Sequence, residues 1–356
     1  MNRRVEALDG LRVVAIVMVM LFHYYWRFSG RFYGFDFAVP EFFQYGYLGV
    51  QLFFVISGFV ISLTLTKCNS FLEFFKKRFV RLIPGMLICS SITFMIFLTF
   101  DPPGLFENSK SIYNYLVSNT FIPPGIINKT LGTDLSYIDG VYWSLWVEIQ
   151  FYVVAGIFYF LSPRFFFRNY VIFALVSVLS LAALNSSYGN ELITDFIGQS
   201  ACSKLKIVLG GVQLVRYNLW FLLGIVIYKL YYRSNNKLES LFLVVLFGLQ
   251  ALMSNGNEER LFVLFVMIIF LAFLYYPSLL RFLENKALVK VGVASYSIYL
   301  IHQNLGVLIL SEISKSFGLL NWIVPILPII VFSCFGLLSL QHIENPLAKR
   351  LKRFLL

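Results

Sequence analysis

The first apolar run of this 356-residue chain carries two residues whose types suit group-transfer chemistry, Arg12 and His23. A neutral imidazole can take a proton from an attacking hydroxyl or accept an acyl group, and a guanidinium binds phosphates. The eleven-residue spacing is close to three helical turns, so both side chains share one helix face, about 16 Å apart along the axis. Asp9 stands three residues before Arg12, a spacing that allows an ion pair.

Such residues are costly if the run crosses a membrane. An ionisable side chain at the centre of a membrane helix costs at least about 2.5 kcal/mol, so its presence needs a reason. The plainer interpretation is that His23 hydrogen-bonds a neighbouring helix and that Arg12 extends to the interface. Taken alone, the pair favours neither interpretation.

A carboxylate, Glu148, lies inside another apolar run and is too deep to be an interfacial anchor. Ser144 precedes it by one helical turn and could hydrogen-bond it. The neighbouring Trp143, next to Tyr142, is more typical of the aromatic belt at a membrane surface than of a catalytic site.

Basic residues form a further group of candidates. Arg78 and Arg81 share a helix face three residues apart, a spacing that suits phosphate oxygens but also anionic lipids or a cytoplasmic topology signal. Arg216 lies within an apolar run, where it needs a buried counter-charge or an anionic ligand.

A polar stripe near the C-terminus includes Ser295, Tyr299 and His302, with Tyr296 beside it. Their spacing of three to four residues predicts one polar seam on a helix, and such seams serve as often for helix packing as for catalysis. The sequence has no phosphate-binding glycine loop, no nucleophile elbow and no zinc-ligand spacing among its four cysteines.

The composition indicates what positions these residues. Hydrophobic residues make up 59% of the chain and charged residues only 13%, against about 25% in soluble domains. The formal net charge of +11 could suggest nucleic acid, but the Lys and Arg residues stand in short clusters between apolar runs, as topology signals do. We therefore expect membrane lipids, and no nucleic acid, as partners.

About ten apolar runs approach the roughly 20 residues needed to cross a bilayer, which predicts a single all-α transmembrane domain over residues 1–356. Lys and Arg, beginning with Arg3 and Arg4, concentrate in alternate loops, so both termini are predicted to be cytoplasmic. The stretch 101–142 is then extracytoplasmic, either a functional lid or a plain connector. The predicted spans are 10–29, 46–66, 83–100, 143–161, 169–187, 207–231, 238–254, 260–276, 289–310 and 322–342.

Six short motifs resemble those of the acyltransferase family 3 membrane proteins, which O-acetylate bacterial surface polysaccharides. They follow the family's order along nearly the whole chain, and the chain resembles the stand-alone type without an attached hydrolase-like domain. The motifs occupy Leu8–Arg12 with His23, Gly49–Phe59 including Ser57, Arg78–Pro84, Trp143–Glu148, Ser295–His302 and Ile343–Pro346.

The resemblance implies acetyl-CoA, or a similar acyl-CoA, as a cytoplasmic donor substrate, with no permanently bound cofactor and no metal. The acceptor would be a sugar hydroxyl of a cell-surface or lipid-linked glycan, such as an O-antigen or exopolysaccharide, at the bacterial cytoplasmic membrane. His23 would act as general base or transient acyl acceptor, and Glu148 would orient His23 or the acceptor. Acyl-CoA contacts would come from Arg12, Arg78 and Arg81. Supporting or substrate-binding roles would fall to Asp9, Ser57, Tyr142, Trp143, Ser144, Arg216, Tyr296, Tyr299 and His302.

The main alternative is a transporter or flippase for a lipid-linked sugar. Transporters usually show inverted repeats and broken helix pairs, and the sequence shows neither. A purely structural membrane subunit would leave Arg12, His23 and Glu148 without a reason to lie in lipid.

Overall fold

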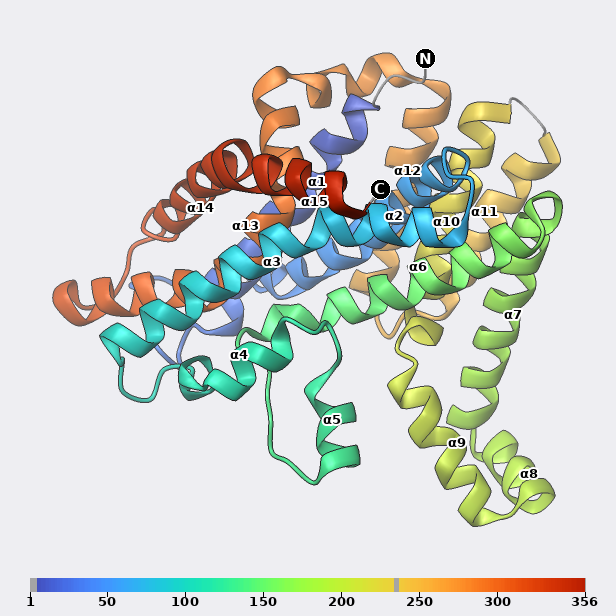
Figure 1. Ribbon diagram of the computed structural model, residues 1–356, viewed down its shortest axis with the longest axis horizontal. Helices are drawn as coiled ribbons and strands as arrows, with labels where there is room; N and C mark the ends of the chain where they lie inside the picture. Colours follow the sequence, from blue (N-terminus) through green and yellow to red (C-terminus); the bar gives the residue numbers. More distant parts are fainter. Residues whose placement is uncertain (1–4, 234–236, 356) are drawn as a thin grey trace. The chain divides into compact units, whose positions relative to one another are not determined.

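The computed structural model describes residues 5–233 and 237–355 and is almost entirely helical, with 83% helix and no strand among these residues (Figure 1). Eight helices of the described chain are long and apolar enough to cross a membrane. The count rises to nine if α12 (Asn257–Tyr275) and the adjoining turn Pro277–Glu284, bent by 100°, form one span. The predicted all-α membrane fold is confirmed, with eight or nine spans instead of ten.

The described residues divide into two compact units. Unit 1 comprises Met1–Phe53, Lys76–Ser144 and Ser254–Leu356, and unit 2 comprises Phe54–Phe75 and Leu145–Met253. Three of the four boundaries fall inside α2 (Gly49–Leu65), α3 (Phe71–Phe100) and α6 (Trp143–Leu161), and the fourth lies between α11 (Lys237–Leu252) and α12. The prediction of one continuous domain stays a prediction, as does the cytoplasmic placement of the termini. Arg3 and Arg4 of the charge pattern lie outside the described residues.

In unit 1, α1 (Glu6–Leu21) packs against α13 (Lys286–Phe317) and the turn Pro277–Glu284. Two glycines make this approach close. A Cβ at Gly10 would overlap the backbone of Leu283, and one at Gly292 would overlap the carbonyl of Asp9. Small residues let membrane helices come into backbone contact, so α1 and α13 are held at a fixed separation.

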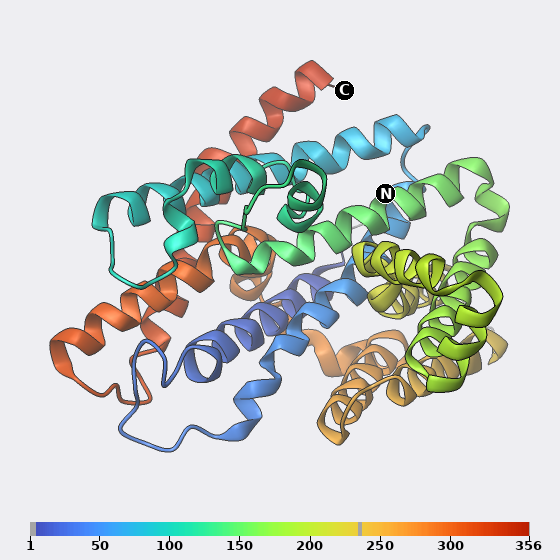
Figure 2. The same cartoon turned by 90° about the horizontal axis from the view of Figure 1, so that it is seen from below.

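Unit 1 also contains shorter helices between α3 and α6, and a helical run after α13 whose first helix packs against α13. Between Asp101 and Asp139 the chain forms α4 (Ile112–Ser118) and α5 (Pro124–Leu131). After α13, α14 (Ile326–Ser339), a π-helical turn and α15 (Asn345–Leu355) make one continuous helical run (Figure 2). In that turn the buried carboxylate of Glu344 accepts hydrogen bonds from Ser297, at 2.6 Å, and Ser339, at 2.7 Å.

Unit 2 is built from α6, α7 (Phe166–Asn185), α8 (Ser187–Ile197), α9 (Gln199–Gly211), α10 (Leu214–Arg233) and α11 (Lys237–Leu252) together with most of α2. Its core is aromatic: the Phe221 ring stacks on Phe54 and Phe151, with centroids 4.7 and 4.1 Å apart. Gly58 of α2 and Gly224 of α10 bring those two backbones together.

Three predicted spans differ from the observed helices. The span 83–100 is the second half of α3, so the basic residues Lys76–Arg81 lie within the same helix and not before it. The span 207–231 is interrupted between α9 and α10, and the span 238–254 corresponds to α11, which has only 16 residues. Hydropathy detects lipid-compatible segments, whereas helix ends depend on local breaks and on polar turns that hydropathy does not register.

Candidate active site

His23 lies where the first helix changes its winding. After Leu21 the α-helix widens into a π-helical turn over Phe22–Arg27, and π turns inside helices are frequent at functional sites. The carbonyls of this turn are held by Tyr33, whose hydroxyl donates to Tyr24 O at 2.8 Å and to His23 O at 3.4 Å. The backbone that carries the imidazole is therefore fixed from outside the helix.

The imidazole of His23 faces His302 on α13. His302 Nε2 lies 3.1 Å from His23 Nδ1, and both side chains are buried. His302 is anchored in turn, since Tyr24 donates to its backbone oxygen at 2.8 Å. The sequence places both histidines on polar helix faces, and the structure joins them into a pair.

The neighbours of this pair determine which nitrogens carry protons. His302 Nδ1 lies 2.7 Å from the carbonyl oxygen of Tyr299, which only accepts, so Nδ1 is the donor and Nε2 is the acceptor in the neutral ring. His23 Nδ1 lies 2.9 Å from the carbonyl oxygen of Val19 and faces His302 Nε2, so it also carries a proton. The unprotonated nitrogen of neutral His23 is therefore Nε2, the atom that can take a proton or attack a thioester.

Aromatic rings enclose His23. Phe22 approaches it edge-on at 5.0 Å, and Phe28 stacks on it at 5.9 Å. Phe28 is itself 5.3 Å from Phe106 in the segment after α3. These rings exclude water, which strengthens hydrogen bonds inside the site.

A second cluster of hydroxyls adjoins His302. The Tyr299 ring lies 5.6 Å from that of His302, and its hydroxyl contacts Ser144 Oγ at 2.8 Å and donates to Val141 O at 3.0 Å. Tyr142 is 1% exposed, and its hydroxyl has no hydrogen-bond partner among the described residues. A buried polar atom without a partner needs an explanation, and a bound substrate group would supply one.

Asp139 lies in a polar network that the sequence motifs do not indicate. Its carboxylate accepts from the backbone N–H groups of Val141 and Asn304, each at 3.1 Å. The Asn304 side chain donates to Ser109 Oγ at 2.9 Å and to Ile138 O at 3.0 Å. The segment between α3 and α6 is thus hydrogen-bonded to α13 two residues beyond His302. Its extracytoplasmic placement and its role as a lid or a connector stay predictions.

Burial raises the pKa of Asp139 to about 7, although the N–H groups of Val141 and Asn304 act in the lowering direction. Because the folded-state pKa lies above the usual value, the folded protein loses stability as the pH rises from about 4 through 7. We expect Asp139→Asn to flatten this dependence in detergent-solubilised protein, measured as the melting temperature from pH 4.5 to 8. Asp134→Asn, an exposed carboxylate of the same segment, is the control. Equal slopes for wild type and Asp139→Asn would contradict the assignment.

Arg12 and Asp9 form the ion pair that their spacing suggests, with Nη1 and Oδ1 2.7 Å apart. Asp9 is 2% exposed, and its carbonyl is the group that meets Gly292. The Arg12 guanidinium is therefore fixed to the same pair of helices, α1 and α13, that carries the histidines.

Glu148 belongs to unit 2, where its Oε1 accepts from Ser57 at 2.9 Å and from Tyr152 at 2.5 Å. The predicted bond from Ser144 is wrong, because Ser144 Oγ is engaged by Val141 O and Tyr299 instead. Glu148 is thus held by one residue of its own helix and by one of α2.

The other candidates lie outside the histidine pair. Tyr296 donates to Leu82 O of α3 at 3.1 Å, and Trp143 begins α6 half-buried. On α3, Arg78 is half-buried and Arg81 is exposed. Arg216 is exposed in the first turn of α10, which begins seven residues later than the predicted span and is itself long and apolar enough to cross a membrane. Its need for a counter-charge or an anionic ligand stays a prediction.

Comparison with known proteins adds an independent line of evidence. The profile of the acyltransferase domain of acyltransferase family 3 matches residues 5–340. The O-acetyltransferase OatA of Staphylococcus aureus is 26% identical over 379 residues, covering 98% of this chain. This chain spans 58% of that protein's length.

Two shorter matches carry related descriptions. An O-acetyl transferase of Shigella phage Sf6 is 28% identical over 42% of this chain and 44% of its own length. The peptidoglycan O-acetyltransferase OatA of Listeria monocytogenes is 27% identical over 43% of this chain and 24% of its own length. No solved structure matches the chain.

Proposed function

Since the chain belongs to acyltransferase family 3, we propose that it transfers acetyl from acyl-CoA to a sugar hydroxyl of a cell-envelope glycan. The observation that carries the proposal is the His23–His302 pair, which leaves His23 Nε2 unprotonated inside an aromatic enclosure. The described relatives are named O-acetyltransferases, and one is named for peptidoglycan, which supports a glycan acceptor.

In the proposed reaction His23 Nε2 removes the proton of the acceptor hydroxyl as its oxygen attacks the thioester carbonyl. The C–S bond breaks, and the proton passes from His23 to the departing CoA thiolate. While Nε2 holds the proton, the imidazolium donates from Nδ1 to His302 Nε2 and Val19 O, which stabilise its charge. An alternative with the same residues has Nε2 attack first and carry the acetyl group before the sugar takes it.

The donor binds from the cytoplasmic side in this proposal. Arg12 and the α3 pair Arg78 and Arg81 supply guanidinium groups for the phosphates and pantetheine of CoA. Glu148, held by Ser57 and Tyr152, is assigned to orienting a substrate hydroxyl, and Tyr142 offers the unpaired hydroxyl noted above. The protein then works in the bacterial cytoplasmic membrane with both termini inside.

The direct test is label transfer in cells with and without this chain. Labelled acetyl-CoA supplied to membrane vesicles should place label on the extracted glycan only when the chain is present, and NMR of the glycan should lose an O-acetyl resonance when it is absent. Unchanged glycan acetylation in its absence would refute the function, and movement of unmodified lipid-linked sugar would favour a flippase.

A further inference from the structure

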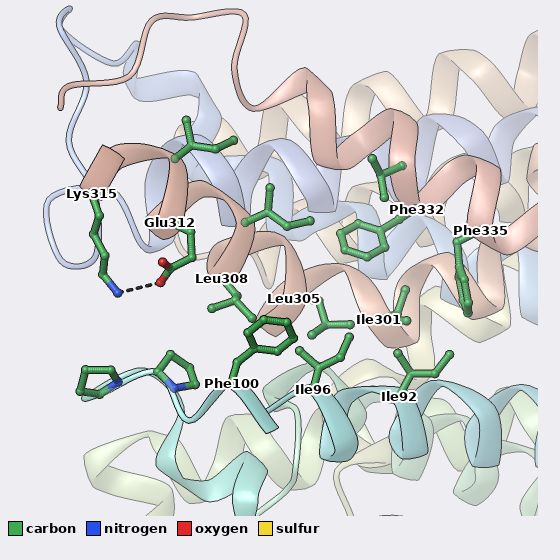
Figure 3. Close-up of a pocket in the computed structure, with 15 residues that line it drawn as sticks. Ile92, Ile96, Phe100, Ile301, Leu305, Leu308, Glu312, Lys315, Phe332 and Phe335 are labelled. Atoms are coloured by element: carbon green, nitrogen blue, oxygen red, sulfur yellow. Dashed lines mark hydrogen bonds and ion pairs between the residues drawn. The ribbon is translucent and has the colours of Figure 1, made fainter. Parts of the chain in front are cut away.

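The last helical run of unit 1 leaves apolar surroundings and ends in a helix of different character. Phe332 and Phe335 of α14 line an apolar cavity of about 760 Å³, together with residues of α3 and α13 (Figure 3). This part of α14 therefore suits the depth of the lipid tails. Asn345, the first residue of α15, comes ten residues after Phe335. That is about 15 Å along a helix, or half of the roughly 30 Å of hydrocarbon, so α15 begins near a membrane surface.

The junction between α14 and α15 is held by a buried carboxylate. Glu344 ends the π-helical turn Leu340–Glu344 and is 7% exposed. It accepts hydrogen bonds from Ser297 of α13 and Ser339 of α14. Helices bend at π turns, because the α-helical hydrogen-bond pattern is interrupted there. The start of α15 is therefore fixed to α13, while its direction beyond the turn can differ from that of α14.

The faces of α15 differ sharply in chemistry. Its large apolar side chains recur at spacings of three and four residues and so share one face: Leu347, Leu351, Phe354 and Leu355. Its basic side chains lie on the opposite face: Lys349, Arg350, Lys352 and Arg353. The helix contains no acidic residue. This pattern is typical of helices that lie along a membrane surface, with the apolar face at the boundary between head groups and acyl chains.

The basic face of α15 is available to a partner. All four of its basic side chains are exposed, and none forms an ion pair with a residue that the structure describes. Lys315, at the end of the apolar cavity, differs because it pairs with Glu312 at 2.7 Å (Figure 3). On the apolar face of α15, Phe354 is 87% exposed. A partner that covers both faces must be anionic at its surface and apolar beneath it.

We propose that α15 binds the surface of an anionic phospholipid bilayer, with its basic residues at the phosphates and Phe354 among the upper parts of the acyl chains. Each Lys or Arg near such a surface strengthens binding about fivefold. A soluble phosphate compound would match the basic face but leave the apolar face in water. The inference goes beyond the proposed function and does not depend on it, because α15 carries none of the residues assigned to the reaction.

Hydrogen exchange of the full chain in nanodiscs tests this contact. The amides of Asn345–Leu355 should exchange about tenfold more slowly in phosphatidylglycerol than in phosphatidylcholine, and high salt should remove most of the difference by screening the charges. Equal exchange in the two lipids would overturn the proposal. Equal slowing in phosphatidylcholine on addition of coenzyme A would also overturn it, in favour of a soluble phosphate ligand.

A double substitution tests the basic face. Lys349→Gln with Arg353→Gln removes two charges from its centre and should reduce the tenfold difference between the lipids to less than about twofold. Lys286→Gln with Lys290→Gln is the matched control, because these two lysines are exposed on α13 with the same four-residue spacing. The control should keep the difference. Equal losses in the two double variants would assign the lipid dependence to overall charge and overturn the role of α15.

A single substitution tests the apolar face. Phe354→Ser should speed exchange of α15 in phosphatidylglycerol about tenfold, because the ring no longer enters the acyl-chain boundary. Phe317→Ser is the control, since Phe317 ends α13 and is 82% exposed. It should leave the exchange of α15 unchanged. Elution of each variant as a single species checks folding, and unchanged exchange in Phe354→Ser would overturn the proposed position of α15 in the membrane surface.

Discussion

Replacing His23 with alanine should reduce acetyl transfer to the glycan about a thousandfold or more, since the variant lacks Nε2 of His23, the unprotonated nitrogen that is not already engaged within the pair. The measurement is initial rate with labelled acetyl-CoA in membrane vesicles, normalised to the amount of inserted protein. Because His23 lies in a π-helical turn already held by Tyr33, the shorter side chain should leave insertion and folding intact.

The chain provides its own control for this substitution. His342 is exposed in the π-helical turn between α14 and α15, so His342→Ala changes the same residue type in a similar backbone. It should retain near-normal activity. Substantial turnover by His23→Ala would remove His23 from the mechanism, whatever the behaviour of the control.

Replacing His302 with alanine should lower kcat about a hundredfold and leave KM for acetyl-CoA nearly unchanged. The reason is positional: His302 Nε2 accepts the Nδ1 proton of His23, which keeps Nε2 of His23 free and supports the imidazolium. Steady-state kinetics of purified protein in detergent measures the two constants separately.

A second substitution separates this role from simple packing. His302→Gln places an amide oxygen where it can accept from His23 Nδ1, so it should recover part of the lost kcat. A structural role for His302 predicts instead that both variants lose thermal stability and activity together. If His302→Ala lowers stability and kcat in parallel, and His302→Gln restores neither, the positioning role is wrong.

Much of the fold can be predicted from the sequence, because each helix that crosses a lipid bilayer needs a run of roughly 20 mostly apolar residues. The apolar runs near His23, Glu148 and His302 all correspond to helices in the structure. The predicted helix bounds are wrong where a polar segment is helical or where a helix ends within an apolar region. Lys76–Arg81 are polar but continue α3, and the chain breaks before Leu214 although the residues on either side are apolar.

The candidate site was only partly predictable. His23 is conspicuous because an imidazole in an apolar run is costly, and that signal is local. Its pairing with His302 joins residues 279 positions apart, and no periodicity encodes which helix faces which. Asp139 and Asn304 were missed for the same reason: each is an ordinary polar residue in sequence, and only tertiary packing makes the carboxylate a buried acceptor. The closest available signal was an acidic residue immediately before an apolar run.

The separation of the two histidines in sequence also has a consequence for biosynthesis. During translation the first helix enters the membrane long before α13 has been made, so the nascent chain carries a lone imidazole without its acceptor or its glycine-mediated contact. The protein can then transfer acyl groups only after α13, which is synthesised late, has packed against α1, which is synthesised early. A ribosome-bound intermediate that ends before α13 should not react with acyl-CoA. The incomplete protein would therefore not hydrolyse the donor during its synthesis.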